Sequence, residues 1–498
     1  MIEGILIGLN TALSLKNILM VVMGCFFGTI IGMLPGLGPM TAIALMIPIT
    51  YGFDPATGLI LMAGVYYGAV FGGSTSSILI NAPGIPGTVA TSFDGYPMAQ
   101  QGKAGKALAI AAYSSFAGGT IAAIFLLFAA PSLSKISLSF RSPDYFALMI
   151  LGLTAVAAFS SKGQFLKAMM MAVLGLMLAC VGQDTLSDIP RFTFNNMNLS
   201  DGISFVLVVM ATFAMSEALT IILRGTDPSS AAKAISLKEL GSIKLDKDET
   251  KKTLKTIPRS SVIGFIVGVL PGAGSTIASF LAYGMERNFV NKEEKEKFGK
   301  GSVHGLAAPE TANNAACSGS FVPLLTLGIP GSGTTAVMLG ALLGFGIQPG
   351  PRLYMTNPEI FWSVIMSMYV GMVILLILNL PLIPYIARIL AVPRTFLIPM
   401  ILFFSVTGIY LMSFNTFDIF LMIGIAVVAT GLRLYKFPMP PLILAFVLGG
   451  LMEENLRRSL LISYGSFNFL WDRPLTAIIL AFTILIFSWQ SYISLKSK

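Results

Sequence analysis

Long apolar stretches separated by short polar loops repeat along the whole chain. Hydrophobic residues make up 55% of the 498 residues and charged residues only 11%, too few to cover the surface of a water-soluble protein. A segment inside a bilayer must satisfy its own backbone hydrogen bonds, so we expect helices. The sequence therefore predicts an all-α polytopic membrane protein with about a dozen membrane segments. The candidate segments are 18–34, 59–80, 107–129, 145–159, 166–181, 203–223, 262–281, 321–345, 360–386, 397–412, 417–432, 442–451 and 476–489.

The stretch 225–258 is the long polar segment of the chain, and it is rich in lysine. Because basic loops stay on the cytoplasmic side, we interpret it as a cytoplasmic linker between a first membrane repeat, 1–224, and a second, 259–498. The net charge of +9 then reflects cytoplasmic loops, and nucleic acid is not expected as a partner. Counting spans from the linker places the C-terminus and the basic segment 92–106 inside. The counterpart of that segment, 349–359, falls outside, which indicates repeats of inverted topology.

Two motifs occur twice, in the same order and at nearly equal spacing. GMLPGLG at 32–38 returns as GVLPGAG at 268–274, and GIPG at 84–87 returns as GIPG at 328–331. This recurrence predicts two structurally equivalent halves. In a membrane chain, Gly/Pro-interrupted segments at corresponding positions of two halves point to the binding site of a transporter.

Each Leu-Pro-Gly-x-Gly motif should break its helix, because proline removes a backbone hydrogen bond and glycine adds freedom. Broken backbone persists only beside protein or a water-filled cavity. The helix that restarts presents free N–H groups to an anion. Alternatively, the glycines only let helices pack closely. We favour a hairpin around Pro271 that enters and leaves the membrane on one side. The candidate substrate-binding residues are Gly36, Gly38, Pro39 and Thr41 in the first copy and Gly272, Gly274, Ser275 and Thr276 in the second.

Hydroxyl groups gather before the second interruption in each half. Hydroxyls and freed carbonyls suit both alkali cations and carboxylates. The alternative is that these side chains bond to their own helix or link helices. The candidates are Ser74, Thr75, Ser76 and Asn81 in the first half and Ser332, Thr334 and Thr335 in the second.

A third element, Glu310 with Asn313 and Asn314, lies in the second half alone. After Pro309, these side chains share one helix face, and an intramembrane carboxylate is by default a functional hypothesis. We expect this group, with Ser318, to couple transport to Na⁺ or H⁺. Helix capping and interhelical hydrogen bonds are the alternative.

Other polar residues indicate structural roles. His304, the only histidine, is expected to be hydrogen-bonded at the membrane edge, and Glu217 to make a structural bond or reach toward Arg224. No catalytic set, transition-metal site or cofactor motif is visible, so an enzyme is not expected. No Lys or Arg lies within the interrupted segments, so helix ends, hydroxyls and a co-bound cation would have to hold an anion.

At these residues the sequence resembles the TctA family, the large membrane subunit of the tripartite tricarboxylate transporters. The resemblance covers both halves. The matching stretches are GMLPGLGP at 32–39, FDP at 53–55, residues 67–87 ending in PGIPG, FDGYPMA at 93–99, LPGAGS at 270–275, and residues 304–331 from HGLAAPE to LGIPG.

The resemblance implies a bacterial inner-membrane importer of di- or tricarboxylates driven by a cation gradient, with sodium as the expected ion. It also implies a small four-span membrane subunit and a periplasmic solute-binding protein as partners. Two competing hypotheses are an anion-selective channel or passive pore, and a scaffold subunit without a substrate site. Transport by one unit sliding against a scaffold is expected by analogy with other binding-protein-dependent carriers.

Overall fold

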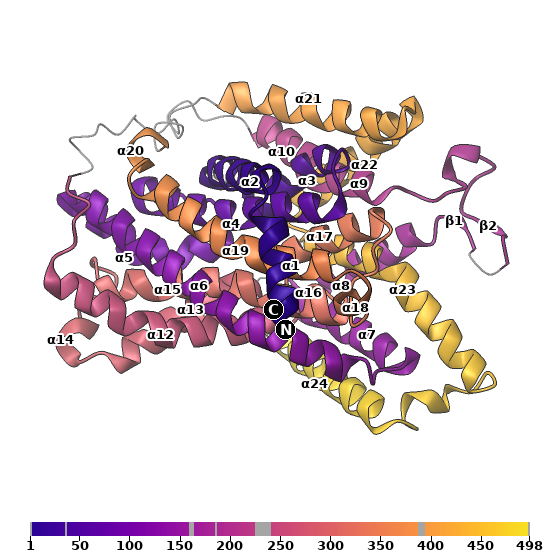
Figure 1. The fold of residues 1–498 in the computed structure, drawn as a ribbon. Helices are drawn as coiled ribbons and strands as arrows, with labels where there is room; N and C mark the ends of the chain where they lie inside the picture. The colour runs from indigo at the N-terminus through magenta and orange to yellow at the C-terminus, as the bar shows by residue number, and fades with distance from the viewer. Residues whose placement is uncertain are drawn as a thin grey trace.

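Almost all of the described chain is helical (Figure 1). The computed structural model describes residues 2–34, 37–158, 164–184, 187–224, 241–386 and 394–496. Within these ranges the β structure is one short antiparallel ribbon of β1 (Gly182–Gln183) and β2 (Pro190–Arg191). The all-α class predicted from the sequence is therefore confirmed.

Along the chain, helices come both before and after the polar segment that begins at residue 225. Those before it are α1 (Ile2–Ala12), α2 (Leu15–Met33), α3 (Gly38–Thr50), α4 (Pro55–Ile80), η1 (Pro86–Thr88), α5 (Val89–Met98), η2 (Ala99–Lys103), α6 (Ala104–Ser137), α7 (Ser142–Ala158), α8 (Phe165–Ala179), η3 (Met197–Leu199), α9 (Phe205–Val209), η4 (Met210–Met215) and α10 (Ser216–Arg224). Those after it are α12 (Lys247–Val269), α13 (Gly274–Phe289), α14 (Lys292–Lys295), α15 (Val303–Gly319), α16 (Phe321–Leu327), α17 (Gly333–Gly344), α18 (Leu353–Thr356), α19 (Pro358–Asn379), α20 (Ile383–Ile386), α21 (Arg394–Ser413), α22 (Thr416–Leu434), α23 (Pro440–Ile462), η7 (Phe467–Leu470) and α24 (Pro474–Lys496).

Several predicted spans are shorter or divided in the structure. Among the described residues, 7 helical stretches are long and apolar enough to cross a membrane, and further apolar helices have only 10–17 residues. The predicted span 262–281 is split between α12 and α13, and 321–345 is split between α16 and α17. The segment 92–106, which we expected to be a loop, is helical. Local Gly and Pro residues explain the two splits.

The two Leu-Pro-Gly motifs break their helices at the same place. α2 gives way to α3 after Leu34, and α12 gives way to α13 after Leu270. Both leucines are extended, with ψ of 110° and 121°. Each new helix starts on a glycine with positive φ, +62° at Gly38 and +61° at Gly274. The predicted breaks are therefore confirmed.

The glycines just before each break serve a different purpose, which is close helix packing. A Cβ on Gly32 would lie 2.1 Å from the carbonyl oxygen of Ala69, and one on Gly268 would lie 2.4 Å from that of Ala316. The matching glycines one turn earlier contact Val65 and Ala312 in the same way. Glycines of these segments thus serve both proposed uses, helix interruption and close packing. Close packing requires glycine because a helix can approach another closely only where side chains are absent.

A second pair of turns also corresponds, but in a different register from the GIPG repeat. α4 ends on Asn81 and α16 ends on Gly328, each with positive φ (51° and 70°). A Cβ on Gly84 would lie 1.8 Å from the carbonyl oxygen of Gly32, and one on Gly331 would lie 2.9 Å from that of Gly268. Gly84 therefore corresponds in its contacts to Gly331, whereas the repeated letters pair it with Gly328.

α12 and α13 form a helical hairpin. Thr256, far before the break, donates a hydrogen bond of 2.9 Å to Glu286, far after it, so the two helices run antiparallel. Residues 225–240 of the predicted linker lie outside the described residues, and residues from Lys247 onward belong to α12. Figure 1 places this hairpin at one end of the molecule and the β1–β2 ribbon at the other.

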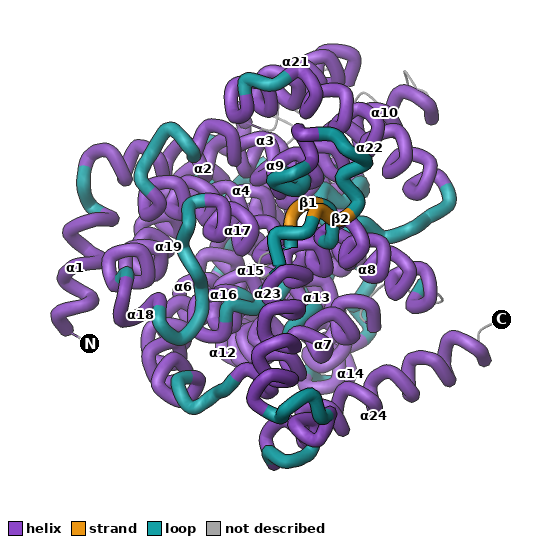
Figure 2. The backbone as a smooth tube through the Cα atoms, turned by 90° about the vertical axis from the view of Figure 1, so that its right-hand side faces the viewer, coloured by secondary structure: helices purple, strands orange, loops and turns teal. Residues whose placement is uncertain are grey.

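Two helices form the centre of the protein. Every residue of α4 from Ala56 to Leu79 is buried, and so is every residue of α15 from His304 to Gly319. By contrast, α24 lies at the outside of the bundle (Figure 2), where most of its membrane-length window is exposed to the surroundings. The core is therefore built around helices that carry many small and hydroxyl residues.

Candidate functional site

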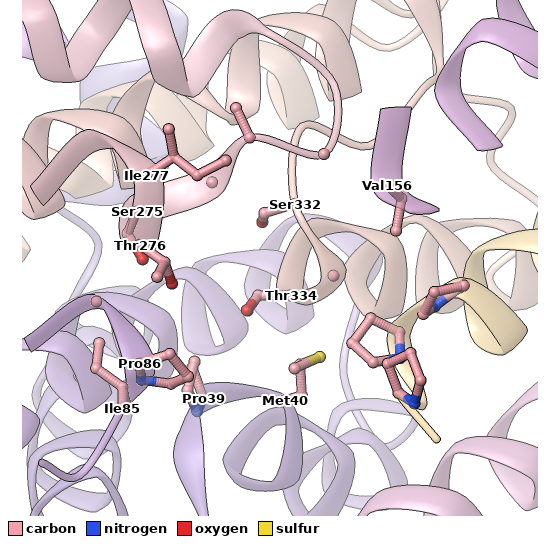
Figure 3. Close-up of a pocket in the computed structure, with 18 of the residues that line it drawn as sticks. Pro39, Met40, Ile85, Pro86, Val156, Ser275, Thr276, Ile277, Ser332 and Thr334 are labelled. Atoms are coloured by element: carbon pink, nitrogen blue, oxygen red, sulfur yellow. The ribbon is translucent and has the colours of Figure 1, made fainter. Parts of the chain in front are cut away.

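Several helices begin around one cavity of about 390 Å³ (Figure 3). The cavity lies where the interrupted segments of the two halves meet, and its walls come from the first turns of α3, η1, α13, α17 and α23. Representative lining residues are Pro39, Pro86, Thr276, Thr334 and Pro440.

The local sequence explains why these helices start here. Pro39 and Pro440 stand in the first turn of α3 and α23, where a missing N–H does no harm. α17 begins with a capping box, in which Ser332 accepts from the N–H of Thr335 at 3.2 Å and the Thr335 hydroxyl accepts from the N–H of Ser332 at 2.8 Å. The N–H of Gly272 donates to the carbonyl oxygen of Gly331 at 3.0 Å, joining the two interruptions of the second half.

The starts of α3, α13 and α23 lack a side-chain cap. Apart from Pro39, which has no N–H, the first N–H groups of α3 and α13 therefore remain available, whereas α23 begins with Pro440 and Pro441 and offers none there. Each of the three helix ends carries a partial positive charge. Among the described residues that line this cavity there is no Lys or Arg. Backbone N–H groups and helix ends are thus the anion-attracting elements of the cavity.

Hydroxyl groups complete the lining. Ser275 and Thr276 from α13 lie on one side, and Ser332 and Thr334 from α17 lie across from them (Figure 3). The Tyr66 hydroxyl is 3.3 Å from that of Ser332. Hydroxyl and N–H donors arranged in this way suit a carboxylate, which accepts several hydrogen bonds at once.

Apart from the cavity, a carboxylate is buried at the centre of the bundle. Glu310 of α15 is fully buried and accepts hydrogen bonds from three hydroxyl groups. Ser74 donates at 2.7 Å, Ser115 at 2.9 Å, and Thr91 donates to the other carboxylate oxygen. In the part of the chain that the structure describes, no Lys or Arg forms an ion pair with Glu310.

Comparison with known proteins agrees with this architecture. The model of the tripartite tricarboxylate transporter TctA family matches residues 18–444. The chain belongs to the TctA family. It is therefore a multi-pass membrane component of a tripartite tricarboxylate transporter, and not an enzyme.

Two relatives from Agrobacterium vitis are similar to this TctA-family chain. The "Uncharacterized 52.8 kDa protein in TAR-I ttuC' 3'region" is 42% identical over 481 residues, which are 97% of this chain and 94% of the relative. The "Uncharacterized protein in TAR-II ttuC' 3'region" is 40% identical over 235 residues, 47% of this chain and 96% of the relative.

The structure brings part of the predicted substrate set of the TctA-family chain to the cavity. Gly38 and Thr41 line an adjoining cavity of about 560 Å³, and Thr335 is buried beneath Ser332 as part of the cap. Gly36 lies outside the described residues. The predicted residues that line the first cavity are Pro39, Gly272, Gly274, Ser275, Thr276, Ser332 and Thr334.

The first hydroxyl cluster of this TctA-family chain does not line either of these two cavities. Ser74 and Thr75 border a small void of about 10 Å³ on the side of α4 that faces Ser115. Ser76 donates to the carbonyl oxygen of Gly73 at 3.1 Å, and Asn81 caps α4. The sequence spacing suggested that the hydroxyl groups of the first cluster share a site with those of the second cluster. The orientation of α4 in the structure instead turns the first cluster toward other helices.

The polar face of α15 forms as predicted. Asn314 donates to the Glu310 carbonyl oxygen at 3.1 Å and to the Asn313 side chain at 2.6 Å. The amide nitrogen of Asn313 and the amide oxygen of Asn314 are buried without a hydrogen-bond partner. Ser318, one turn on, donates to the carbonyl oxygen of Gly119 at 3.3 Å. Unpaired buried amide groups of this kind are expensive, so each requires an explanation.

His304 is buried and hydrogen-bonded, as expected from the sequence. Its Nδ1 lies 2.7 Å from the Thr256 hydroxyl and 3.1 Å from Glu286, which Arg259 also contacts at 2.6 Å. This group joins the two arms of the α12–α13 hairpin to the start of α15. The predicted hydrogen bonding of His304 is therefore confirmed.

Sequence reasoning missed several residues of the TctA-family site. The cavities are also lined by Tyr66, Gln164 and the proline-rich segment 438–441. This segment is a further proline-rich helix start, and it could have been recognised from the sequence. Glu217, which we expected to make a structural bond or to reach toward Arg224, forms an ion pair whose partner, Arg433 of α22, was not predicted.

Proposed function

We propose that this TctA-family chain is the large transmembrane subunit of a binding-protein-dependent secondary transporter that imports di- or tricarboxylates by cation symport, with Na⁺ as the first choice and H⁺ as the second. Its partners would be a small four-span membrane subunit and a periplasmic solute-binding protein. The protein would lie in a bacterial inner membrane, with its C-terminus and the segment 225–258 in the cytoplasm.

The observation that carries the carboxylate assignment is the convergence of uncapped helix starts on one cavity. The first turns of α3 and α13 offer N–H groups that have no side-chain acceptor, and α23, which begins with two prolines, adds only the partial positive charge of its helix end. Ser275, Thr276 and Thr334 add hydroxyl donors beside them. A carboxylate can accept hydrogen bonds from all of these donors. No fixed positive charge is then needed in this cavity, and such a charge would make release of the substrate slow.

Corresponding contacts in the two halves support a repeat. Gly32 and Gly268 pack on the helices α4 and α15 in the same way, and Gly84 and Gly331 close on those same two glycines. Loop charges favour opposite orientations of the halves, which would bring the restarted helices toward the cavity from both sides of the membrane. Alternating access would then move one part of this assembly past the other.

The buried carboxylate of Glu310 supports coupling to a cation. A carboxylate inside a membrane protein requires a proton or a positive charge, and hydroxyl donors alone compensate it poorly. The hydroxyl groups of Ser74 and Ser115 keep lone pairs for a cation, and the unpaired amide oxygen of Asn314 is a further oxygen ligand nearby on α15.

Reconstitution tests this proposal. We would place the chain in vesicles with its two partner proteins and measure uptake of labelled citrate and succinate with and without an inward Na⁺ gradient. Accumulation above the outside concentration, dependent on both Na⁺ and the binding protein, is the expected result. A proton gradient that replaces Na⁺ would assign the coupling to H⁺.

The same experiment distinguishes the proposed function from the two competing functions. Uptake that stops at equal concentrations and ignores the cation gradient would identify a passive pore or anion channel. Binding of partners without any carboxylate flux, and without carboxylate binding to the purified chain, would identify a scaffold subunit.

A further inference from the structure

The second cavity, of about 560 Å³, adjoins the first. The two share lining residues, among them Pro39, Met40, Ile85 and Pro86. Unlike the first cavity, this one is lined by charged groups, Arg433 of α22 and Glu217 of α10. A ligand in the first cavity that extends past Pro39 therefore meets this pair.

Arg433 is held in place by backbone. Its Nη2 and Nε donate to the carbonyl oxygen of Thr212 at 2.9 Å and 3.3 Å, and its guanidinium lies 5.8 Å from the ring centre of Phe213. Its Nη1 donates to Glu217. A guanidinium has more N–H donors than these bonds use, so Arg433 can donate to a further carboxylate oxygen in the cavity.

A helix irregularity makes this arrangement possible. In the π-helical turn η4, the N–H of Ser216 bonds to the carbonyl oxygen of Ala211, one residue earlier than in an α-helix. The carbonyl oxygen of Thr212 therefore loses its usual N–H partner, and it accepts from the Ser216 hydroxyl at 2.5 Å and from Arg433 instead. Irregular turns of this kind are common at functional sites.

We propose that Arg433 is a second anion subsite, which takes the distal carboxylate of a substrate that carries at least two, and that Glu217 competes for it. The inference rests on the proposed carboxylate transport. The helix starts of the first cavity hold one carboxylate, and Arg433 holds another. Glu217 keeps the half-buried arginine paired when no substrate is bound and weakens its hold on a bound carboxylate, so release stays rapid.

Removal of the whole charge pair tests the subsite without stranding a charge. The double variant Arg433→Gln/Glu217→Gln should bind citrate and succinate about 10- to 100-fold more weakly, the value of one charge-assisted contact. Binding of butyrate, a monocarboxylate of the same chain length as succinate, should change little. The purified full chain in nanodiscs, titrated calorimetrically or by ligand-induced thermal shift, provides the measurement.

A matched pair elsewhere controls for general damage. Arg473→Gln/Asp144→Asn removes an ion pair of 2.8 Å between Asp144 of α7 and Arg473, the residue directly before α24, outside both cavities, and should leave carboxylate affinities unchanged. The single variant Glu217→Gln should instead tighten succinate binding and slow its release, because the competitor for Arg433 is gone. A purely structural tie would change stability but not the discrimination between succinate and butyrate.

The outcomes separate the two proposals. If the unmodified chain binds citrate, and the double variant binds it equally well, the Arg433 subsite is wrong while carboxylate transport stands. If the unmodified chain binds neither citrate nor succinate, the proposed function fails and the subsite falls with it.

Discussion

The hydroxyl group of Ser74 lies 2.7 Å from the carboxylate of Glu310 and so joins the two central helices, α4 and α15. One helix comes from each half of the chain, and both are buried along their length. Any change in the charge of Glu310 is therefore felt where the halves meet. This contact links the proposed coupling group to the packing of the core.

Glu310→Gln should abolish the dependence of carboxylate uptake on the cation gradient, because the amide keeps the shape of the side chain but cannot bind a cation by charge. We expect the driven rate to fall by at least about tenfold, the value of one charge-assisted contact. Vesicle uptake with and without Na⁺ measures this, with Glu359→Gln as the control, since Glu359 only accepts a hydrogen bond from the Thr11 hydroxyl at an exposed position. Unchanged Na⁺ dependence would remove Glu310 from the coupling site.

Asn314→Ala should raise the Na⁺ concentration needed for half-maximal uptake, because the variant lacks the unpaired amide oxygen that is available to a cation. It should leave the protein inserted in the membrane. The measurement is the Na⁺ dependence of uptake at fixed citrate. If both Asn314→Ala and Glu310→Gln keep the original Na⁺ dependence, the coupling assignment is wrong.

Gly272→Ala should destabilise the break after α12 by roughly 1–3 kcal/mol, the usual cost of a strained backbone position. The residue has a φ of +81°, and a Cβ would lie 2.6 Å from the backbone nitrogen of Val156. Gly284→Ala, inside α13 with open space around it, should instead be neutral or slightly stabilising. Thermal unfolding in detergent compares the two, and equal effects would contradict the geometry.

Ser332→Ala and Thr334→Val should separate helix capping from ligand binding. Ser332 caps α17 and lines the cavity, so its loss should lower stability by about 1 kcal/mol and weaken citrate binding. Thr334 lines the cavity but does not cap the helix, so its variant should weaken binding at nearly unchanged stability. Unfolding temperatures and citrate titrations provide the test. A stability loss in Thr334→Val as large as in Ser332→Ala would count against this division.

The local features of the fold were predictable because they depend on neighbouring residues. The breaks after Leu34 and Leu270 follow from proline and glycine in the chain itself, and both occur where predicted. The shared face of Glu310, Asn313 and Asn314 follows from helical spacing. Apolar content likewise was enough to predict a helical membrane protein, since lipid leaves the backbone few alternatives.

The partners of these residues were not predictable, because they depend on which helix faces which. Spacing placed Ser74 with the second hydroxyl cluster, but the packing of α4 against α15 turns it to Glu310. The letters of the repeat paired Gly84 with Gly328, whereas its contacts match those of Gly331.

The sequence by itself determined the membrane class, the family resemblance, the positions of the helix breaks and the acidic face of α15. Only the tertiary structure decided that restarted helices from both halves share one cavity and that Arg433 stands beside it, held by the freed carbonyl oxygen of Thr212. Breaks and faces arise from residues a few positions apart, whereas a binding cavity arises from helices that are distant in the chain and meet only after packing.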